Sequence, residues 1–195
     1  PRTSSAASDV YKRQIKDYSH FENDKKYLEG TGSIVLDRHN KFAYCSLSKR
    51  SDPDLLNIFC SEMNYKPVVF NSFHQSKPIY HTNVMMSICN NFSIICLDSI
   101  ADKNQRRSVK TNLEDSNLEI IDITVDQMCS FLGNCIQLVD IKSNPLLVMS
   151  SRAYNSINNS QLKKIEKHTD IIYSDIKTIE DNGGGSARCM IAEIF

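Results

Sequence analysis

Short apolar runs, separated by polar turns and charged stretches, recur along the chain from Gly32 onward. Alternating or continuous apolar runs of about four to eight residues are typical of strands, whereas apolar residues three and four positions apart favour a helix. Over residues 33–73 these patterns predict strand, strand, helix and strand, in that order. The helix is predicted over 51–63, because Asp52 suits the N-cap and Pro53 suits the first helical position.

The same order is predicted twice more along the chain. The second unit is expected to have strands at 83–89, 92–98 and 118–123, with a charged helix at 102–115. The third is expected to have strands at 135–141, 145–150 and 170–176, with a helix at 161–168. Each unit occupies about fifty residues, and repeats of that period stack or close around an axis. We therefore expect a mixed α/β fold of three ββαβ units.

A short polar junction precedes the first strand of each unit and the final apolar run. The junctions hold Glu29, His81, Asn134 and Cys189, which lie 52, 53 and 55 residues apart. Residues at the same position in each unit of a radial repeat point to one axis. A carboxylate, an imidazole and a thiol are therefore predicted to meet in one pocket. Such a set is typical of nucleophilic catalysis. Taken singly, a structural role for His81 and a surface position for Glu29 are the alternatives.

The glycine-rich segment 181–195 contains the thiol of this set. Gly183, Gly184 and Gly185 allow the backbone to turn sharply and to pass close to a ligand. Cys189 follows a cation, Arg188, which favours the thiolate, and the apolar run after it predicts a terminal strand. The alternative is a tight turn with Cys189 as a small core residue.

The composition narrows the classes of function. With 195 residues, 41% of them hydrophobic, the chain is long enough for a sizeable core. Lys and Arg total 23, as do Asp and Glu, so the charge indicates neither nucleic acid nor a membrane surface as a partner. No apolar run reaches the roughly 20 residues of a membrane span. The seven cysteines form no CxxC pair or zinc-type cluster, so we expect buried, reduced thiols (Cys89, Cys96 and Cys135 above all) and a cytoplasmic protein.

The opening residues 1–14 are polar and aperiodic, and they resemble adapter-derived peptide sequence. We expect them to lie outside the domain, which is predicted to span residues 15–195.

Four motifs resemble a known family. They are LEGTG at 28–32, LSKRSD at 47–52, YHTNV at 80–84 and GGGSARCM at 183–190. In this order they are similar to the motifs of the guanidino-group-modifying superfamily of pentein β/α-propellers, which includes arginine deiminases, dimethylarginine dimethylaminohydrolases and amidinotransferases. The pattern most resembles the arginine-deiminase-related branch that contains citrulline ureidases.

The resemblance implies a ring of five repeats around an axis. Three units and a closing strand fall within this chain, so we expect about two N-terminal repeats, with the family's substrate-binding aspartate, to be missing. It also implies a small-molecule substrate and no metal or organic cofactor, and it leaves homo-oligomer formation open.

The resemblance also implies residue roles. Cys189 is the expected nucleophile, His81 the acid and base, and Glu29 the group that holds the substrate nitrogens and orients His81. Arg50 is the candidate for the substrate carboxylate, with a solvated loop arginine as the alternative. Gly185 is expected to bring the backbone close to the substrate, and Asn134 to line the pocket.

Two departures from the family pattern bear on the substrate. The Gly-Gly-Asp of the family is Gly30-Thr31-Gly32 here, and its His-x-Asp is His81-Thr82-Asn83. A guanidinium would lose charge-assisted hydrogen bonds of about 1.5–3 kcal/mol each. A neutral ureido group needs a donor as well as acceptors, and the Asn83 amide supplies both.

These departures favour a citrulline hydrolase that forms ornithine, carbon dioxide and ammonia. Arginine deiminase and dimethylargininase activity remain alternatives. A non-catalytic pentein-like binding protein is the alternative from another class, but it predicts loss of the nucleophile, and both Cys189 and His81 are present.

Overall fold

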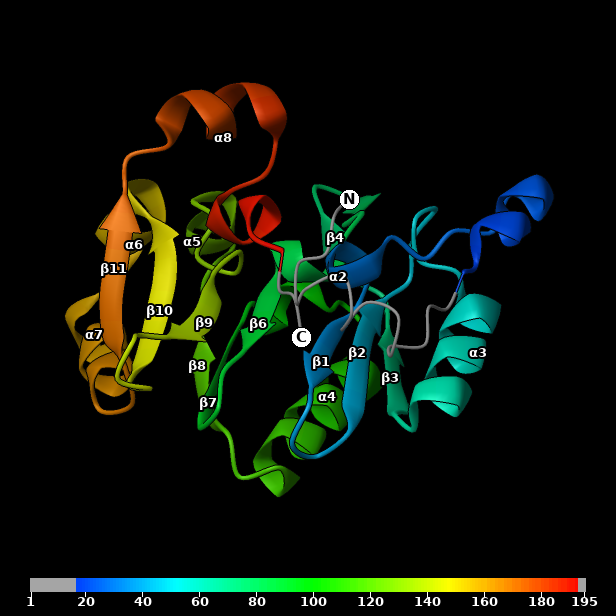
Figure 1. Cartoon of the computed structure of the whole chain (residues 1–195), viewed down its shortest axis with the longest axis horizontal. Coiled ribbons are helices and arrows are strands. Elements are labelled where there is room, and N and C mark those ends of the chain that lie inside the picture. Colours follow the sequence, from blue (N-terminus) through cyan, green and yellow to red (C-terminus); the bar gives the residue numbers. More distant parts are fainter. Residues whose placement is uncertain (1–16, 193–195) are drawn as a thin grey trace, which may run out of the picture.

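Three three-stranded sheets, with a two-stranded hairpin between the first and the second, follow one another along the chain in the computed structural model (Figure 1). The structure describes residues 17–192, so the predicted separate segment 1–14 lies outside the described residues. Each sheet has three strands and comes from one predicted unit. The mixed α/β class and the repeated strand, strand, helix, strand order are confirmed in all three units.

The first sheet comprises β1 (Val35–Asp37), β2 (Phe42–Ser46) and β3 (Lys66–Phe70), in that order. The antiparallel β1–β2 pair is a hairpin, whereas β3 is parallel to β2 and needs a crossover, which α3 (Pro53–Met63) provides. Asp52 caps α3 by accepting from the backbone N–H groups of Asp54 and Leu55, and Pro53 occupies the first turn. The predicted helix over 51–63 is thereby confirmed together with its cap.

The other two sheets repeat this topology. The second comprises β6 (Met86–Ile88), β7 (Phe92–Ile95) and β8 (Glu119–Asp122), with α4 (Lys103–Asp115) as the crossover helix. The third comprises β9 (Ile136–Val139), β10 (Pro145–Ser150) and β11 (Asp170–Ser174), with α6 (Ser151–Ser156) and α7 (Asn159–Glu166) between the last two strands.

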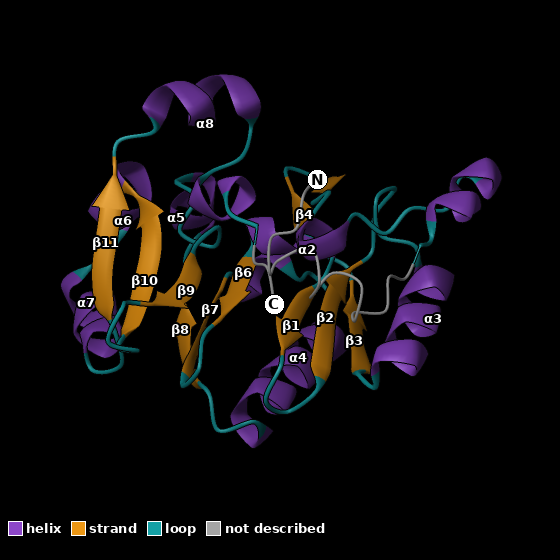
Figure 2. Ribbon diagram, viewed as in Figure 1, coloured by secondary structure: helices purple, strands orange, loops and turns teal. Residues whose placement is uncertain are grey.

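Several short elements connect or extend the units (Figure 2). They include the 3-10 helices η1 (Ser19–Asp24) and η3 (Leu97–Ser99), the hairpin β4 (Phe73–His74) and β5 (Lys77–Pro78), and the helices α5 (Val125–Cys129) and α8 (Lys177–Gly183). The sequence predicted one strand over 66–73, but β3 ends at Phe70 and the chain turns into the β4–β5 hairpin. Gln75 and Ser76 form its turn with positive φ angles, a backbone feature that the apolar pattern does not reveal.

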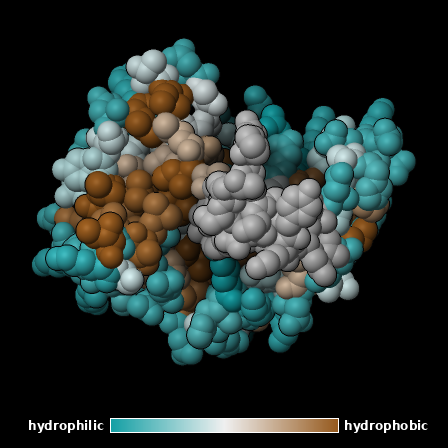
Figure 3. All heavy atoms as spheres, in the orientation of Figure 1, coloured by the Kyte–Doolittle hydropathy of each residue, from teal (hydrophilic) through white to brown (hydrophobic). Residues whose placement is uncertain are grey.

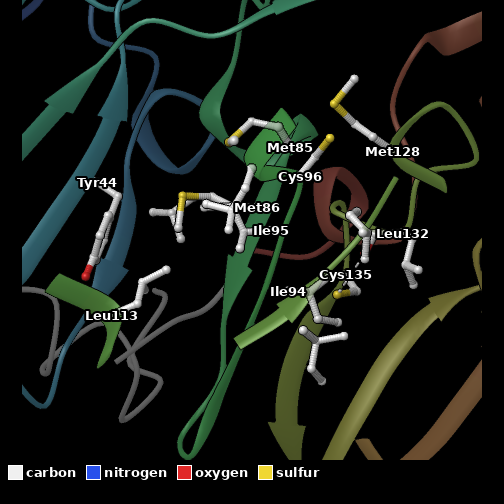
Figure 4. Close-up of a cluster of buried hydrophobic side chains, with 14 of the residues drawn as sticks. Tyr44, Met85, Met86, Ile94, Ile95, Cys96, Leu113, Met128, Leu132 and Cys135 are labelled. Atoms are coloured by element: carbon white, nitrogen blue, oxygen red, sulfur yellow. Dashed lines mark hydrogen bonds between the residues drawn. The ribbon is translucent and has the colours of Figure 1, made fainter. Parts of the chain in front are cut away.

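One large hydrophobic cluster joins all three units. Figure 4 shows part of it, with Met85, Met86, Ile94, Ile95 and Leu113 among the labelled side chains, and each of these five is fully buried. A smaller cluster packs α3 against the first sheet. The shared core fixes the three units relative to one another.

The cysteines follow the predicted pattern with one exception. Cys45, Cys60, Cys89, Cys96 and Cys135 are buried free thiols, as predicted. Burial raises the pKa of Cys45 to about 12 and that of Cys135 to about 11, so both are neutral at physiological pH. The prediction of core packing is wrong for Cys129, which is exposed at the end of α5.

The surface carries apolar side chains on one side, where β10 and β11 lie (Figure 3). Val139, Ile172 and Tyr173 are among the exposed large hydrophobic residues there. No helix within residues 17–192 combines the length and the apolar character needed to cross a membrane.

Candidate active site

The polar junctions before the first two sheets form short helical turns. Glu29 directly precedes the turn α2 (Gly30–Ser33), and His81 directly precedes the 3-10 helix η2 (Thr82–Val84). Cys189 lies in a third turn, η4 (Ala187–Met190).

The terminal segment departs from the prediction. A loop–strand junction was expected at Cys189, with a strand from Met190 to Ile194, but residues 190–192 form no strand, and 193–195 lie outside the described residues. The Cys189 N–H donates to the Ser186 carbonyl at 3.0 Å, and the Ile191 N–H donates to that of Arg188 at 3.2 Å. These local hydrogen bonds satisfy backbone groups that a strand would leave for a neighbouring strand.

Buried hydroxyl groups tie the first two junctions together. Ser33 Oγ donates to the Arg50 carbonyl at 2.6 Å and accepts from the Glu29 N–H at 2.9 Å. Thr82 Oγ1 donates to the Ser33 carbonyl at 2.6 Å and accepts from the Ser46 N–H at 2.8 Å. Because Ser33 and Thr82 are fully buried, these bonds hold the backbone on either side of Glu29 and His81.

Glu29 and His81 are in direct contact. His81 Nε2 donates to Glu29 Oε2 at 2.7 Å, and Arg50 Nη1 donates to the same oxygen at 3.3 Å. Gly32 packs against the imidazole, since a Cβ on Gly32 would lie only 2.9 Å from His81 Nδ1 and Cε1. The glycine therefore makes room for the ring that the carboxylate orients.

The thiol of Cys189 contacts the amide of Asn134. Asn134 Nδ2 lies 3.3 Å from Cys189 Sγ, and the thiol lies 3.4 Å from Asn134 Oδ1. Asn134 is 2% exposed, and it also donates to the Asn83 carbonyl at 3.0 Å and accepts from the Ser186 N–H at 3.2 Å. The sequence predicted only a lining role for Asn134, whereas the structure places its side chain against the thiol.

Two glycines allow these close approaches. A Cβ on Gly185 would lie 3.1 Å from Cys189 Sγ, so this residue adjoins the thiol. A Cβ on Gly133 would lie 2.5 Å from the Val84 carbonyl oxygen, so only a glycine lets the chain before Asn134 pack against the His81 junction.

Glu29, His81, Asn83 and Cys189 line one pocket of about 480 Å³. Asn83 is 3% exposed, and its buried Oδ1 has no hydrogen-bond partner among the described residues. An unpaired buried acceptor costs about 1–3 kcal/mol, so this atom is suited to a ligand N–H group. The structure thus brings the carboxylate, the imidazole, the amide and the thiol to one cavity, with Gly185 beside the thiol.

Arg50 is not among the residues that line this pocket. Its guanidinium group pairs with Glu29 and lies over the Tyr80 ring, with Cζ 5.3 Å from the ring centroid. Two other arginines, Arg38 and Arg188, line the pocket. The sequence marked Arg188 only as the cation beside the thiol, and Arg38, in the turn between two strands, carried no signal.

Within the described residues, no group of three or more His, Cys, Asp and Glu side chains is arranged to hold a metal ion. Cys129 has an exposed free thiol outside the pocket. Its Sγ lies 3.7 Å from Nε2 of His74, a residue of the β4–β5 hairpin.

With His81 as the predicted acid and base, replacing Gly32 by alanine is expected to lower turnover by about 10- to 100-fold, since the new methyl group must displace the His81 ring. Gly183→Ala is the matched control, because a Cβ there meets only Ile179 Cγ2 at 3.8 Å. Steady-state kinetics and thermal unfolding of both variants test the expectation. Equal activity in the two variants would show that the Gly32–His81 contact does not matter for turnover.

A family model described as eukaryotic N,N-dimethylarginine dimethylhydrolase matches residues 6–195. The match begins inside the opening segment that the sequence set apart. Among curated proteins, no match is found.

The chain is also similar in fold to solved structures. The N-terminal domain of ArgZ, a cyanobacterial arginine dihydrolase, superposes with a TM-score of 0.66 at 15% identity over 84% of this chain and 55% of that one. A variant of that domain was captured covalently bound to a reaction intermediate, and it superposes with a TM-score of 0.67 at 15% identity over 84% of this chain and 55% of that one. Agmatine deiminase from C. jejuni gives a TM-score of 0.52 at 11% identity, over 93% of this chain and 58% of that one. This chain thus spans little more than half the length of those structures.

Proposed function

Because the chain belongs to the family of eukaryotic N,N-dimethylarginine dimethylhydrolases, we propose that it is a cysteine-dependent hydrolase of C–N bonds in ureido or guanidino amino acids. The observation that carries the proposal is the meeting of Glu29, His81 and Cys189 around one pocket, although they come from three separate parts of the chain. A nucleophile, a base and a group that orients the base are the minimal set for covalent catalysis.

The reaction begins when the Cys189 thiolate attacks the central carbon of the ureido or guanidino group. His81 donates a proton to the leaving amine as the C–N bond breaks, and an S-carbamoyl or S-alkylthiouronium enzyme remains. His81 then takes a proton from water, which attacks the same carbon and releases the thiolate. Glu29 fixes the imidazole and accepts hydrogen bonds from the substrate nitrogens.

Asn134 offers the Cys189 thiolate a hydrogen-bond donor, since Asn134 Nδ2 lies 3.3 Å from Cys189 Sγ. A donor aimed at a developing negative charge stabilises it most when the donor itself is held in place. The bonds of Asn134 to Asn83 and Ser186 supply that restraint.

We propose citrulline as the substrate. The pocket lining contains the carboxylate of Glu29 but also the guanidinium groups of Arg38 and Arg188. Glu29 already pairs with Arg50 and His81, so it offers a cationic guanidinium group less than a free carboxylate would. The unpaired Asn83 Oδ1 suits a ureido N–H group, and its Nδ2 can donate to the ureido oxygen. Arg188, which lines the pocket, and Arg50 are the candidates for the substrate carboxylate.

With citrulline, the amine that leaves is ornithine, and the enzyme retains an S-carbamoyl group. Water converts this group into carbamic acid, which decomposes to carbon dioxide and ammonia. Atoms and charges balance without a metal ion or an organic cofactor.

N,N-dimethylarginine is the second candidate, favoured by the family to which the chain belongs. In that case dimethylamine leaves, and water releases citrulline from the S-alkylthiouronium enzyme. A binding protein without catalysis is the third reading, and the retained thiol and imidazole argue against it. The five buried free thiols suit a reducing compartment, so we place the protein in the cytoplasm.

Product analysis of the purified protein with citrulline, arginine and N,N-dimethylarginine separates these candidates. We expect ornithine, carbon dioxide and ammonia in equal amounts from citrulline, and slower release of product from the two cationic substrates. Citrulline and dimethylamine formed from N,N-dimethylarginine at the higher rate would instead support the second candidate. Absence of turnover and of a covalent enzyme adduct with all three would contradict the hydrolase proposal.

A further inference from the structure

Tyr80, the residue before His81, makes contacts with three parts of the site. Its Oη donates to the Gly184 carbonyl at 3.0 Å, across 104 positions of the chain. Its ring centroid lies 4.9 Å from that of His81. Arg50 Cζ lies over the Tyr80 ring, 5.3 Å from the ring centroid. The residue is 43% exposed, so the core does not require it.

The catalytic groups are supported by different halves of the molecule. His81 is held by Glu29 and Gly32, in the first unit. The segment that carries Cys189 is held by the third unit, because the Ser186 N–H donates to Asn134 Oδ1 at 3.2 Å and Ser186 Oγ donates to Glu180 Oε1 at 2.7 Å. The distance between nucleophile and acid therefore depends on contacts that join the halves.

Two of the hydrogen bonds between these parts lie next to the catalytic groups. One lies in the buried floor, where Asn134 Nδ2 donates to the Asn83 carbonyl at 3.0 Å. The other lies at the exposed rim, where Tyr80 binds the Gly184 carbonyl. The other attachments of the segment, from Ser186 and Arg188, lie on the side of the third unit, so without the Tyr80 bond the turn before them could pivot away from His81.

Gly184 is the place where such a pivot is easiest. It follows α8 with a φ angle of 69°, and a Cβ built on it would meet nothing within 4 Å. A glycine in open space has no side chain to hold it, so its backbone is restrained by its hydrogen bonds.

Tyr80 itself is well restrained. Its carbonyl oxygen accepts from Ser48 Oγ at 2.8 Å, and its ring is held between contacts with His81 and Arg50. A rigid anchor for a flexible turn is what a positioning role requires.

We propose that Tyr80 is a positioning residue, which holds the Gly184 turn and thereby sets Cys189 at working distance from His81. The inference rests on the proposed hydrolase function, and it adds a residue outside the pocket lining to that site. Because Tyr80 is not among the residues that line the pocket, we expect it to affect the chemical step and not substrate binding.

The test variant is Tyr80→Phe, which keeps the ring contacts and removes only the hydroxyl. We expect kcat to fall about tenfold with KM within about twofold, because small misplacements of reacting groups slow chemistry. Tyr173→Phe is the matched control, since Tyr173 is 48% exposed on β11 and is not among the residues that line the pocket. That control is expected to keep the kcat, and both variants are expected to keep the thermal midpoint.

Amide hydrogen exchange over residues 183–189 gives a readout that needs no substrate. We expect faster exchange in Tyr80→Phe than in the unmodified protein or in Tyr173→Phe. If no substrate is turned over, the exchange result still decides whether Tyr80 holds the turn. Unchanged exchange with unchanged kcat would overturn the proposal. A rise in KM with unchanged exchange would overturn it too, because it would make Tyr80 a substrate contact.

Discussion

Cys189→Ser is expected to lower turnover by a factor on the order of 10³ or more while leaving the fold intact. A serine hydroxyl at neutral pH has no appreciable alkoxide fraction, so the nucleophile is lost although its geometry remains. Cys189 is exposed and lies outside the hydrophobic clusters, so the exchange of sulfur for oxygen costs little packing. Steady-state kinetics and thermal unfolding measure the two expectations separately.

Cys129→Ser is the matched control, since Cys129 is also exposed and also has a nitrogen partner nearby, His74 Nε2. Burial raises the pKa of Cys129, with Asp126 adding to the shift, so this thiol is a weak nucleophile. A haloacetamidine reagent is expected to label Cys189 first, and bound substrate should protect it. Equal labelling of the two exposed cysteines would show that Cys189 has no special environment. Misfolding of Cys189→Ser, with activity in the remaining folded fraction, would return the residue to a structural role.

The repeated units could be predicted because their local signals agree with their packing. The helix over 51–63 combined an N-cap, a proline and an apolar face, and each signal corresponds to a contact in the structure. The strand at β7 could be found because it is buried on both faces of its sheet, with Ile94 and Ile95 fully buried.

The end of the chain could not be predicted in the same way. Met190 to Ile194 is apolar and suits a strand, but a strand needs a neighbour with free backbone groups. The amino-acid sequence does not indicate which backbone N–H and C=O groups are free to pair with such a strand. In the structure Arg188 donates its backbone N–H to the Asn134 carbonyl at 3.4 Å, and the local turn η4 takes up the rest.

The candidate site was predicted from the equivalent positions of the junctions in the repeated units. These positions determine which junctions meet, but not which side chains touch. They placed Glu29, His81 and Cys189 at one pocket. They did not predict that Arg50 would turn toward Glu29 and Tyr80, because that depends on rotamers of exposed side chains. The contributions of Arg38 and Tyr80 depend on contacts across the chain, and a single sequence contains no signal for those.

Asn83 determines, in the proposed function, whether the pocket prefers a neutral or a cationic substrate. Asn83→Asp replaces the amide by a carboxylate of the same shape at a buried position where Oδ1 has no partner among the described residues. A guanidinium group would gain a charge-assisted hydrogen bond of about 1.5–3 kcal/mol, whereas a ureido group would lose a donor. This change corresponds to about 10- to 100-fold in relative kcat/KM.

We therefore expect Asn83→Asp to raise the ratio of kcat/KM for N,N-dimethylarginine to that for citrulline by about 10- to 100-fold. The shift should grow with pH, because burial disfavours the ionised carboxylate and only the ionised form makes the new bond. Asn91→Asp is the matched control: it adds the same charge at an exposed turn that does not line this pocket, and its ratio should stay unchanged. Competition between the two substrates, followed by mass spectrometry of the products across a pH series, measures the ratio directly. A ratio that stays constant in Asn83→Asp, in folded protein with the thiol still reactive, would mean that Asn83 does not face the reacting group. The preference for citrulline would then lose its physical basis, while the assignment of Cys189 and His81 would stand.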